Sequence, residues 1–539
     1  MPIPTGGAWP PPHLAPAYDA YRDWDAWYTG DPDGLRNVYA NRGPRGQSLP
    51  PSQRVRGSQY AGGLVGTVSR WLWGAPPPAG ARDGRIHVPL PADLAATAAN
   101  LLFSEPPQVT SENPAVQKRL DQLVEDGLYT MLLHAAEANS VLGDVYLRPV
   151  IDVDVYPDRA FLAAVHADGA IPTIRWGKLI EVTFWSTLVV DGDTHVRLLE
   201  HHEVVNGAGR IVYAVHEGNS RELGRPVPLT EHAAAAHLAD LVDEESAQET
   251  KLTRLDVVRI PNAGPQRRWR SDGPLKYLGR SDFDGNEPWF DALDDVWTSW
   301  MRDIRQARGR IIVPSYMLSS NGPGQGATFD AEREVFAQLE MMPGQQGTGI
   351  TINQFQIRWQ EHQASAEAVE QVAMRHAGLS PQTLGEQGGD VAMTATEAQA
   401  RERLSFTTRG NRTEGAWKPG IADATELLME VEAVNFGGPP PERPNVEFGD
   451  SVSESPEATA RTVQLYRAAQ AISIDTAVRM VHPEWDDTEV GREVKRIQDE
   501  LGGGEDPEVV LAGAAGNRPP GEQDEGQDDE ETEEQTDEE

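Results

Sequence analysis

The sequence contains no cysteine among its 539 residues. That absence excludes a disulfide scaffold, a thiolate zinc site, an iron–sulfur cluster and a cysteine nucleophile. Basic residues are scarce: Lys and Arg total 47 against 84 Asp and Glu, which gives a formal net charge of −37. Duplex affinity comes mainly from basic groups that release counterions, so this balance argues against a protein that reads nucleic-acid sequence.

Long apolar runs are missing as well. The longest, such as 182–190, falls far short of the roughly 20 residues that span a bilayer. The proline-rich segment 1–16 lacks the basic and apolar blocks of a secretory signal. We therefore expect a soluble protein made in a cytoplasm. The common catalytic motifs are also absent: there is no P-loop, no H-E-x-x-H zinc helix and no G-x-S-x-G nucleophile elbow.

Helical and strand-like patterns alternate in the first half of the chain. Apolar spacings of three and four predict one long amphipathic helix over 114–142, capped by Gly143. From 145 to 215 the period changes to two, with turns at Asp168-Gly169, Asp191-Gly192 and Asn206-Gly207. This pattern predicts a single antiparallel sheet packed on the preceding helix.

The second half is predominantly helical. Helices are expected over 288–308 and 361–376, and they bracket a mixed insertion of about 50 residues. A capping box at Thr394 predicts another helix, with a kink at Pro419 before the helical spacing continues to about 434.

Near the end of the sequence three shorter helices are expected between 455 and 501. The last stretch, 522–539, has twelve acidic residues and neither basic nor apolar ones. Such a segment cannot bury enough surface to offset its ordering entropy, which predicts a disordered tail.

Two groups of residues resemble metal ligands, although each has a simpler structural explanation. Asp152 and Asp154 are two apart in a strand pattern and would share one face, as paired metal ligands or as a solvated face of an edge strand. The second group is His201-His202-Glu203, in which the two histidines are neighbours in a strand and point to opposite faces, so they cannot easily share one metal. In both cases the structural interpretation is favoured.

The expected helix over 288–308 carries aromatic and basic residues of interest. Its tryptophans, at positions 289, 297 and 300, form a stripe at helical spacing that indicates packing more than a stacking surface for a ligand or nucleic acid. A local basic cluster follows at its end: it consists of Arg302, Arg305, Arg308 and Arg310. These arginines could complement the helix dipole and pair with acids, or contact phosphates that pass nearby.

Short motifs recur in a fixed order along about residues 60–500. They are Trp71-Leu72-Trp73-Gly74, His87-Val88-Pro89-Leu90, Leu101 to Pro106, Gly143 to Arg148 with Asp152, Pro314, Gly324 to Phe329, Glu332 to Val335, Gln354 to Arg358 with Glu361-His362, Ala377 to Gly385, and Thr394 to Glu397. In this order they resemble the portal proteins of tailed bacteriophages, in particular the type common in phages of actinobacteria.

The resemblance implies a subunit of a ring, usually of twelve copies, at one capsid vertex. The implied fold is α+β and mainly helical. Its segments are an N-terminal region and wing over 1–285, a first stem helix over 286–310, a clip over 311–357, a second stem helix over 358–377, a tunnel loop over 378–393, a kinked long helix and return strand over 394–452, a helical crown over 453–502 and an acidic disordered tail over 503–539.

Such a ring is the channel through which double-stranded DNA is packaged and ejected, without reading its sequence. The resemblance implies that it initiates procapsid assembly and binds the terminase large subunit, a head–tail adaptor, and the major capsid and scaffolding proteins. It places the chain in the virion after assembly in the host cytoplasm, with no membrane partner, no catalytic residue, no metal and no cofactor. The residues expected to line the channel lie in the tunnel loop: Leu384, Gly385, Gln387, Gly388, Gly389, Asp390 and Met393.

Two alternatives remain from the sequence. One is a phage-encoded metal-dependent hydrolase that uses Asp152, Asp154 and either His201 or His202. The other is a capsid-associated binding protein whose acidic tail, 522–539, mimics DNA. The exact number of subunits in a ring depends on a small rotation between neighbours, which sequence does not fix.

Overall fold

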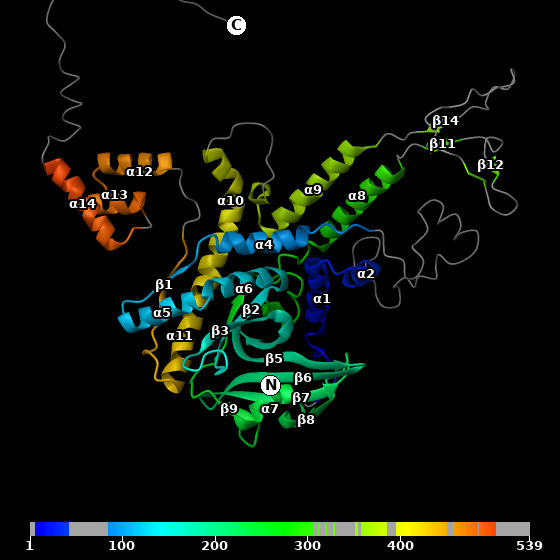
Figure 1. The fold of residues 1–539 in the computed structure, drawn as a ribbon, viewed down its shortest axis with the longest axis horizontal. Helices are drawn as coiled ribbons and strands as arrows, with labels where there is room; N and C mark the ends of the chain where they lie inside the picture. Colours follow the sequence, from blue (N-terminus) through cyan, green and yellow to red (C-terminus); the bar gives the residue numbers. More distant parts are fainter. Residues whose placement is uncertain are drawn as a thin grey trace, which may run out of the picture. The chain divides into compact units, whose positions relative to one another are not determined.

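The computed structural model describes residues 6–41, 85–306, 310–312, 319–320, 327–328, 351–353, 357–384, 395–449, 456–482 and 485–502. The chain divides into two compact units, Met1–Gly449 and Asp450–Glu539. About half of the described residues are helical and several sheets are present, so the protein has an α+β fold (Figure 1). The predicted acidic tail, 522–539, lies outside the described residues.

The helices of the first unit come from both halves of its sequence. They are α1 (Ala15–Thr29), α2 (Pro32–Asn41), α4 (Leu90–Leu102), α5 (Pro114–Glu125), α6 (Leu128–Leu142), the short α7 (Ala233–Ala236), α8 (Glu287–Gln306), α9 (Trp359–Ala377), α10 (Ala395–Arg412) and α11 (Lys418–Asn435). The second unit, from 450 onward, contains α12 (Pro456–Ala468), α13 (Ile474–Val481) and α14 (Asp487–Gly502), as the sequence predicts. None of the described helices combines the length and apolar character needed to cross a membrane.

The strands form two main sheets. A three-stranded sheet has the order β10-β2-β3, with β2 (Asp144–Val150), β3 (Phe161–His166) and β10 (Val258–Pro261). A six-stranded sheet consists of β4 (Ala170–Arg175), β5 (Lys178–Asp191), β6 (Thr194–Val205), β7 (Ala208–Gly218) and β8 (Arg225–Val227) in this order, with β9 (Ala247–Glu249) also paired to β7. All of these pairings are antiparallel.

Three two-stranded ladders complete the described strands. They are β1 (Gln108–Thr110) with β15 (Asn445–Glu447), β11 (Arg310–Ile312) with β14 (Thr351–Asn353), and β12 (Ser319–Ser320) with β13 (Ala327–Thr328). The first of these joins segments from opposite ends of the first unit.

The prediction of one sheet over 145–215 is wrong, because the strands divide between two sheets. Strand β3 belongs to the smaller sheet and β4 to the larger one, and the segment Ala167–Gly169 between them is a short 3₁₀ helix and not a hairpin turn. Alternating hydrophobicity identifies a strand but not its partner, and β2 pairs on one side with β10, far along the chain. The turn at Asn206-Gly207 is a hairpin turn as predicted, with φ of 53° and 84°.

The prediction of one helix over 114–142 is also wrong. The chain breaks after α5 at Asp126-Gly127 and restarts as α6. Gly127 has a φ of 95°, a left-handed conformation that interrupts an α-helix and that glycine adopts without strain. Gly143 caps α6 as predicted: its φ is 90° and its N–H donates to the Asn139 carbonyl.

The first unit has two large apolar cores. In one, α1 contributes Tyr21, Trp24 and Trp27, which are all buried, and packs with residues of α4, α8 and α9. In the other, α5, α6 and α11 pack on the smaller sheet, with Trp417 and Leu132 fully buried. The second core therefore depends on residues separated by about 300 positions in sequence, such as those of α5 and α11.

The long helix after residue 394 is irregular at a different place from the one predicted. A π-helical turn, Thr413–Trp417, separates α10 from α11. Pro419 lies in the first turn of α11, directly after this π-helical turn. The irregular geometry is therefore taken up by the turn before the proline, and Trp417 from this turn is buried in the core.

Candidate functional site on a helical hairpin

Two helices, α8 and α9, form an antiparallel hairpin that carries an inserted segment. They lie side by side (Figure 1) and confirm the helices predicted over 288–308 and 361–376. At their far ends, β11 pairs with β14 in antiparallel register, with Arg310 opposite Asn353. The chain therefore leaves the hairpin after α8 and returns to α9 at the same place.

The base of the hairpin is tied to the body by a buried polar network. The Asn286 side-chain amide donates to the carbonyls of Asp282 and of Ala373, at 2.9 and 3.1 Å, and so links the start of α8 to α9. The Asp282 carboxylate accepts from Ser140, Asn262 and Arg412, at 2.6, 3.0 and 2.6 Å. These hydrogen bonds join the start of α8 to α9 and to α10, and so they fix the base of the hairpin.

A short segment before α4 runs along α8. The buried carboxylate of Asp294 accepts the backbone N–H of Val88 at 2.8 Å and the hydroxyl of Tyr39 at 2.5 Å, and lies 3.1 Å from Nδ1 of His87. The Ile86 N–H donates to Thr298, one turn further on. Asp294 thus holds the segment 85–88 and Tyr39 against α8.

The outer part of the hairpin is held together by an aromatic stack and an ion pair. Trp300 stacks on His362 with ring centroids 6.1 Å apart and an interplanar angle of 7°, and Trp297 packs on Trp300 at 5.0 Å. His362 donates to Asp303 at 2.9 Å, and this hydrogen bond, with help from Arg358, lowers the pKa of Asp303. The packing interpretation of this part of the tryptophan stripe is confirmed.

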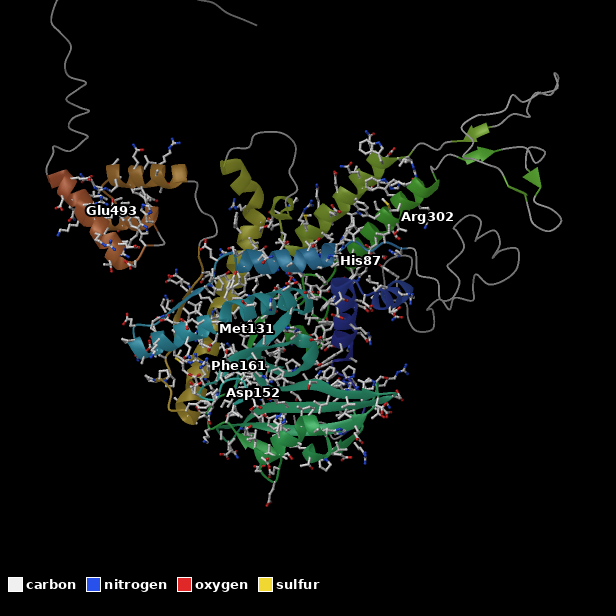
Figure 2. The ribbon with its side chains drawn as sticks, viewed as in Figure 1. His87, Met131, Asp152, Phe161, Arg302 and Glu493 are labelled. Carbon is white, nitrogen blue, oxygen red and sulfur yellow. The ribbon has the colours of Figure 1, made fainter. Side chains whose placement is uncertain are left out.

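The predicted basic cluster is only partly described. Arg302 lies on α8 with an exposed side chain (Figure 2). The side chains of Arg305, Arg308 and Arg310 lie outside the described residues, although the backbone of Arg305 belongs to α8 and that of Arg310 to β11. Contact of these arginines with phosphates stays a prediction.

The glycine-rich segment after α9 is anchored where it begins. Gly378 caps α9 with a φ of 81°, and residues Pro381–Leu384 form a 3₁₀ helix. The Ser405 hydroxyl on α10 accepts the Ser380 N–H at 2.8 Å. Beyond this point the predicted channel-lining residues, and the side chain of Leu384, lie outside the described part: they are Gly385, Gln387, Gly388, Gly389, Asp390 and Met393.

The two aspartates considered as metal ligands do not lie in a strand. Asp152 (Figure 2) and Asp154 are exposed in a turn after β2. The Asp154 N–H donates to the Asp152 carboxylate at 3.0 Å. The strand assignment was therefore wrong, while the solvated position agrees with the favoured interpretation. Among the described residues, the group able to share a metal ion consists of Glu181, His201 and Glu203, without either aspartate.

The two histidines of β6 point to opposite faces, as predicted, and both are buried. His202 lies between Asp256 and Glu200, whose carboxylates are 2.9 and 3.3 Å from its ring nitrogens. Burial alone would lower the pKa of His202, but these two carboxylates outweigh it and raise the value to about 9. Burial would raise the pKa of Glu200, but His202 and Arg148 lower it to about 2.

Sequence reasoning missed Glu181 as the neighbour of His201. The spacing His201-x-Glu203 was visible, since residues two apart in a strand share a face. The position of Glu181 depends on the register of β5 against β6, which the sequence does not encode locally. The pairing of Asp303 with His362 was also missed, because it depends on how α8 and α9 face each other, which the sequence does not encode locally.

No known protein-family model matches this chain, and no curated protein matches it either.

Proposed function

We propose that this chain is the portal subunit of a tailed bacteriophage. Copies of it close into a ring around an axial channel through which double-stranded DNA enters and leaves the capsid. In this role it initiates procapsid assembly and binds the terminase large subunit, a head–tail adaptor, and the major capsid and scaffolding proteins. It acts by shape and assembly and catalyses no reaction.

The observation that carries this proposal is the hairpin of α8 and α9 with its inserted segment. The ordered motifs assign the two stem helices, the clip and the tunnel loop of a portal to these residues. The structure supports the assignment with a helix pair that is fixed at its base by Asn286 and joined at its far end by the ladder of β11 and β14. The glycine-rich segment then follows directly after α9.

Exposed apolar side chains on the hairpin support assembly into a larger particle. Trp359 is 52% exposed, and Trp289 and Ile304 are each 38% exposed. Exposed large hydrophobic groups are costly in water, and neighbouring subunits of a ring would cover them. We therefore expect this hairpin to contribute to the contact between neighbouring copies.

The charge balance fits a channel through which DNA slides. A wall with many basic groups would bind phosphates strongly through counterion release. With 47 basic against 84 acidic residues, the subunit offers few such groups, and the local cluster from Arg302 to Arg310 gives weak contact that does not depend on sequence.

Negative-stain imaging and native mass spectrometry of the purified full-length chain test the proposal. Twelve subunits of 59.0 kDa would give a ring of roughly 708 kDa with an axial hole. A chain that ends at residue 502 should still form this ring, because the acidic tail is not needed for closure. On the alternative of a DNA-mimicking tail, the same truncation would abolish function.

A pair of variants makes the test specific to the hairpin. Trp359→Glu should weaken or abolish ring formation, while Trp176→Glu, at an 86% exposed position in the turn between β4 and β5, should leave it intact. A monomer or small oligomer of the wild-type chain would refute the proposal. Metal-dependent hydrolysis that is lost in Asp152→Ala would favour the hydrolase alternative instead.

A further inference from the structure

Three potential metal ligands converge on one face of the larger sheet. His201 and Glu203 are two apart in β6 and share a face. Thr183 of β5 lies opposite His201 in the register, so Glu181, two residues earlier, lies on the same face. Nε2 of His201 is 3.5 Å from a Glu203 oxygen and 3.9 Å from a Glu181 oxygen. The ligand atoms of the three residues all lie within 4.8 Å of one another.

The buried nitrogen at the centre of this group has no hydrogen bond to any residue that the structure describes. His201 is 2% exposed, and its Nε2 finds no hydrogen-bond partner among these residues, while its Nδ1 lies 2.8 Å from the Thr183 hydroxyl. Leaving a buried polar atom unsatisfied is costly and uncommon. When Nδ1 donates to Thr183, the lone pair of Nε2 faces two carboxylates.

The neighbouring histidine shows the contrast. His202 lies within hydrogen-bond distance of Asp256, at 2.9 and 3.0 Å, and 3.3 Å from Glu200. His201 lies 3.5 and 3.9 Å from its two carboxylates, and among the described residues its hydrogen bond is to the Thr183 hydroxyl. The same strand therefore holds one histidine with close carboxylate partners and one whose carboxylates lie further from its ring.

We infer that Glu181, His201 and Glu203 bind a divalent transition-metal cation of the Zn²⁺ class. One imidazole nitrogen and two carboxylate oxygens are a donor set that such cations accept. With bonds of about 2.0–2.2 Å, neighbouring ligand atoms of a tetrahedral site lie roughly 3.4 Å apart. The distances of 3.5 and 3.9 Å need only a small side-chain adjustment. A tetrahedral cation held by three protein ligands keeps a fourth position for water or substrate.

Residues around the three ligands are placed as supports for such a site. The Thr183 hydroxyl lies 2.8 Å from Nδ1 of His201, so a cation on Nε2 would leave the ring proton on Nδ1 to donate to this hydroxyl. Arg210 donates to Oε1 of Glu203 at 2.8 Å, which leaves Oε2, the oxygen nearer His201, for the metal. The cation would cross-link β5 and β6 in the larger sheet, whether or not the chain forms a ring.

Zn²⁺ titration of the untagged full-length protein by calorimetry, in excess Mg²⁺ to occupy the acidic surface, tests this inference. We expect one tight site per chain. His201→Gln and Glu203→Gln should each weaken binding more than tenfold. Thr183→Val should keep the stoichiometry but weaken binding by about 10–100-fold, as loss of a supporting hydrogen bond does. His195→Gln, on the same strand, is the matched control and should bind as the wild type does.

X-ray absorption of the Zn²⁺-loaded wild type provides a readout that needs no variant to fold. It should show one histidine nitrogen among oxygen ligands. The inference is overturned if the wild type has no tight site, if the absorption spectrum lacks histidine scattering, or if folded His201→Gln binds Zn²⁺ as well as the wild type. Circular dichroism establishes that each variant is folded.

Discussion

The buried histidine of β6 predicts a specific dependence of stability on pH. His202 is 1% exposed in its side chain and lies between Asp256 and Glu200, which raise its pKa to about 9. In the unfolded chain the pKa of a histidine is about 6.5. Because the folded value is the higher one, this interaction stabilises the fold fully below about pH 6.5 and is lost as the pH rises through about 9.

The size of the effect follows from the shift in pKa. A difference of about 2.5 units, at about 1.4 kcal/mol per unit, corresponds to about 3 kcal/mol of folding free energy. The lowered pKa of Glu200 reports the same interaction from the other partner and is not added to this figure. The value is a large fraction of the total stability of a typical domain.

Hydrogen exchange of the amides in β5 and β6 measures this free energy locally, so that it does not require two-state unfolding of the whole chain. The wild type should lose about 3 kcal/mol of protection in this sheet between about pH 6 and about pH 10, after correction for the intrinsic exchange rate. His202→Gln cannot take up the proton, so it should be less stable at the lower pH and approach the wild type at the higher pH. His195→Gln should follow the wild type throughout.

Parallel pH profiles for wild type and His202→Gln would refute the reasoning, because the proton on His202 would then make no difference to folding. A wild-type profile that rises between about pH 6.5 and about pH 9 would contradict the sign of the shift.

Two further predictions concern the packing of the first unit. Arg119 donates to Glu432 at 2.8 to 3.1 Å in a buried pair, so Arg119→Leu alone should lower the free energy of unfolding by about 3–5 kcal/mol. The double variant Arg119→Leu with Glu432→Met should recover most of this loss, as measured by denaturant unfolding of the wild type, both single variants and the double variant. Losses of the two single variants that simply add in the double variant would contradict this prediction. Gly143→Ala should lower the melting temperature markedly, because the φ of Gly143 is 90° and a Cβ there would lie 2.6 Å from the Gly279 carbonyl oxygen. Gly192→Ala should lower the melting temperature less, because Gly192 has a φ of 59° but open space around it. Equal decreases for the two variants would show that the close approach to Gly279 does not matter.

The helices of the second half were predictable because their signals are local. The helical spacing over 288–308 is confirmed by α8, in which Phe290 and Leu293 are buried. Gly378 terminates α9 in a left-handed conformation, as glycine commonly does at a helix end. Ser473 caps α13 by accepting the Thr476 N–H at 3.1 Å.

The errors came from places where tertiary partners decide the structure. The apolar spacing continues through Gly127 on both sides, so periodicity alone could not reveal the break between α5 and α6. Alternation over 145–215 could not show that β2 would pair with β10 and leave the larger sheet to start at β4. Asp152 and Asp154 continue an apparent alternation, yet their carboxylate and backbone bond to each other in a turn.

The candidate sites were partly accessible to sequence reasoning. The hairpin and its insertion could be inferred from two helical patterns with a mixed segment between them. The buried partners could not, because Arg119 and Glu432 are separated by 313 positions and read locally as surface charges. The group around His201 required the strand register as well.

The ladder at the far end of the hairpin has a consequence for variation between related chains. In antiparallel pairs, opposite residues lie about 4.5–5.5 Å apart, so Arg310 and Asn353 are fixed as close neighbours whatever lies between them. The intervening sequence can therefore lengthen, shorten or be exchanged while the two helices keep their spacing.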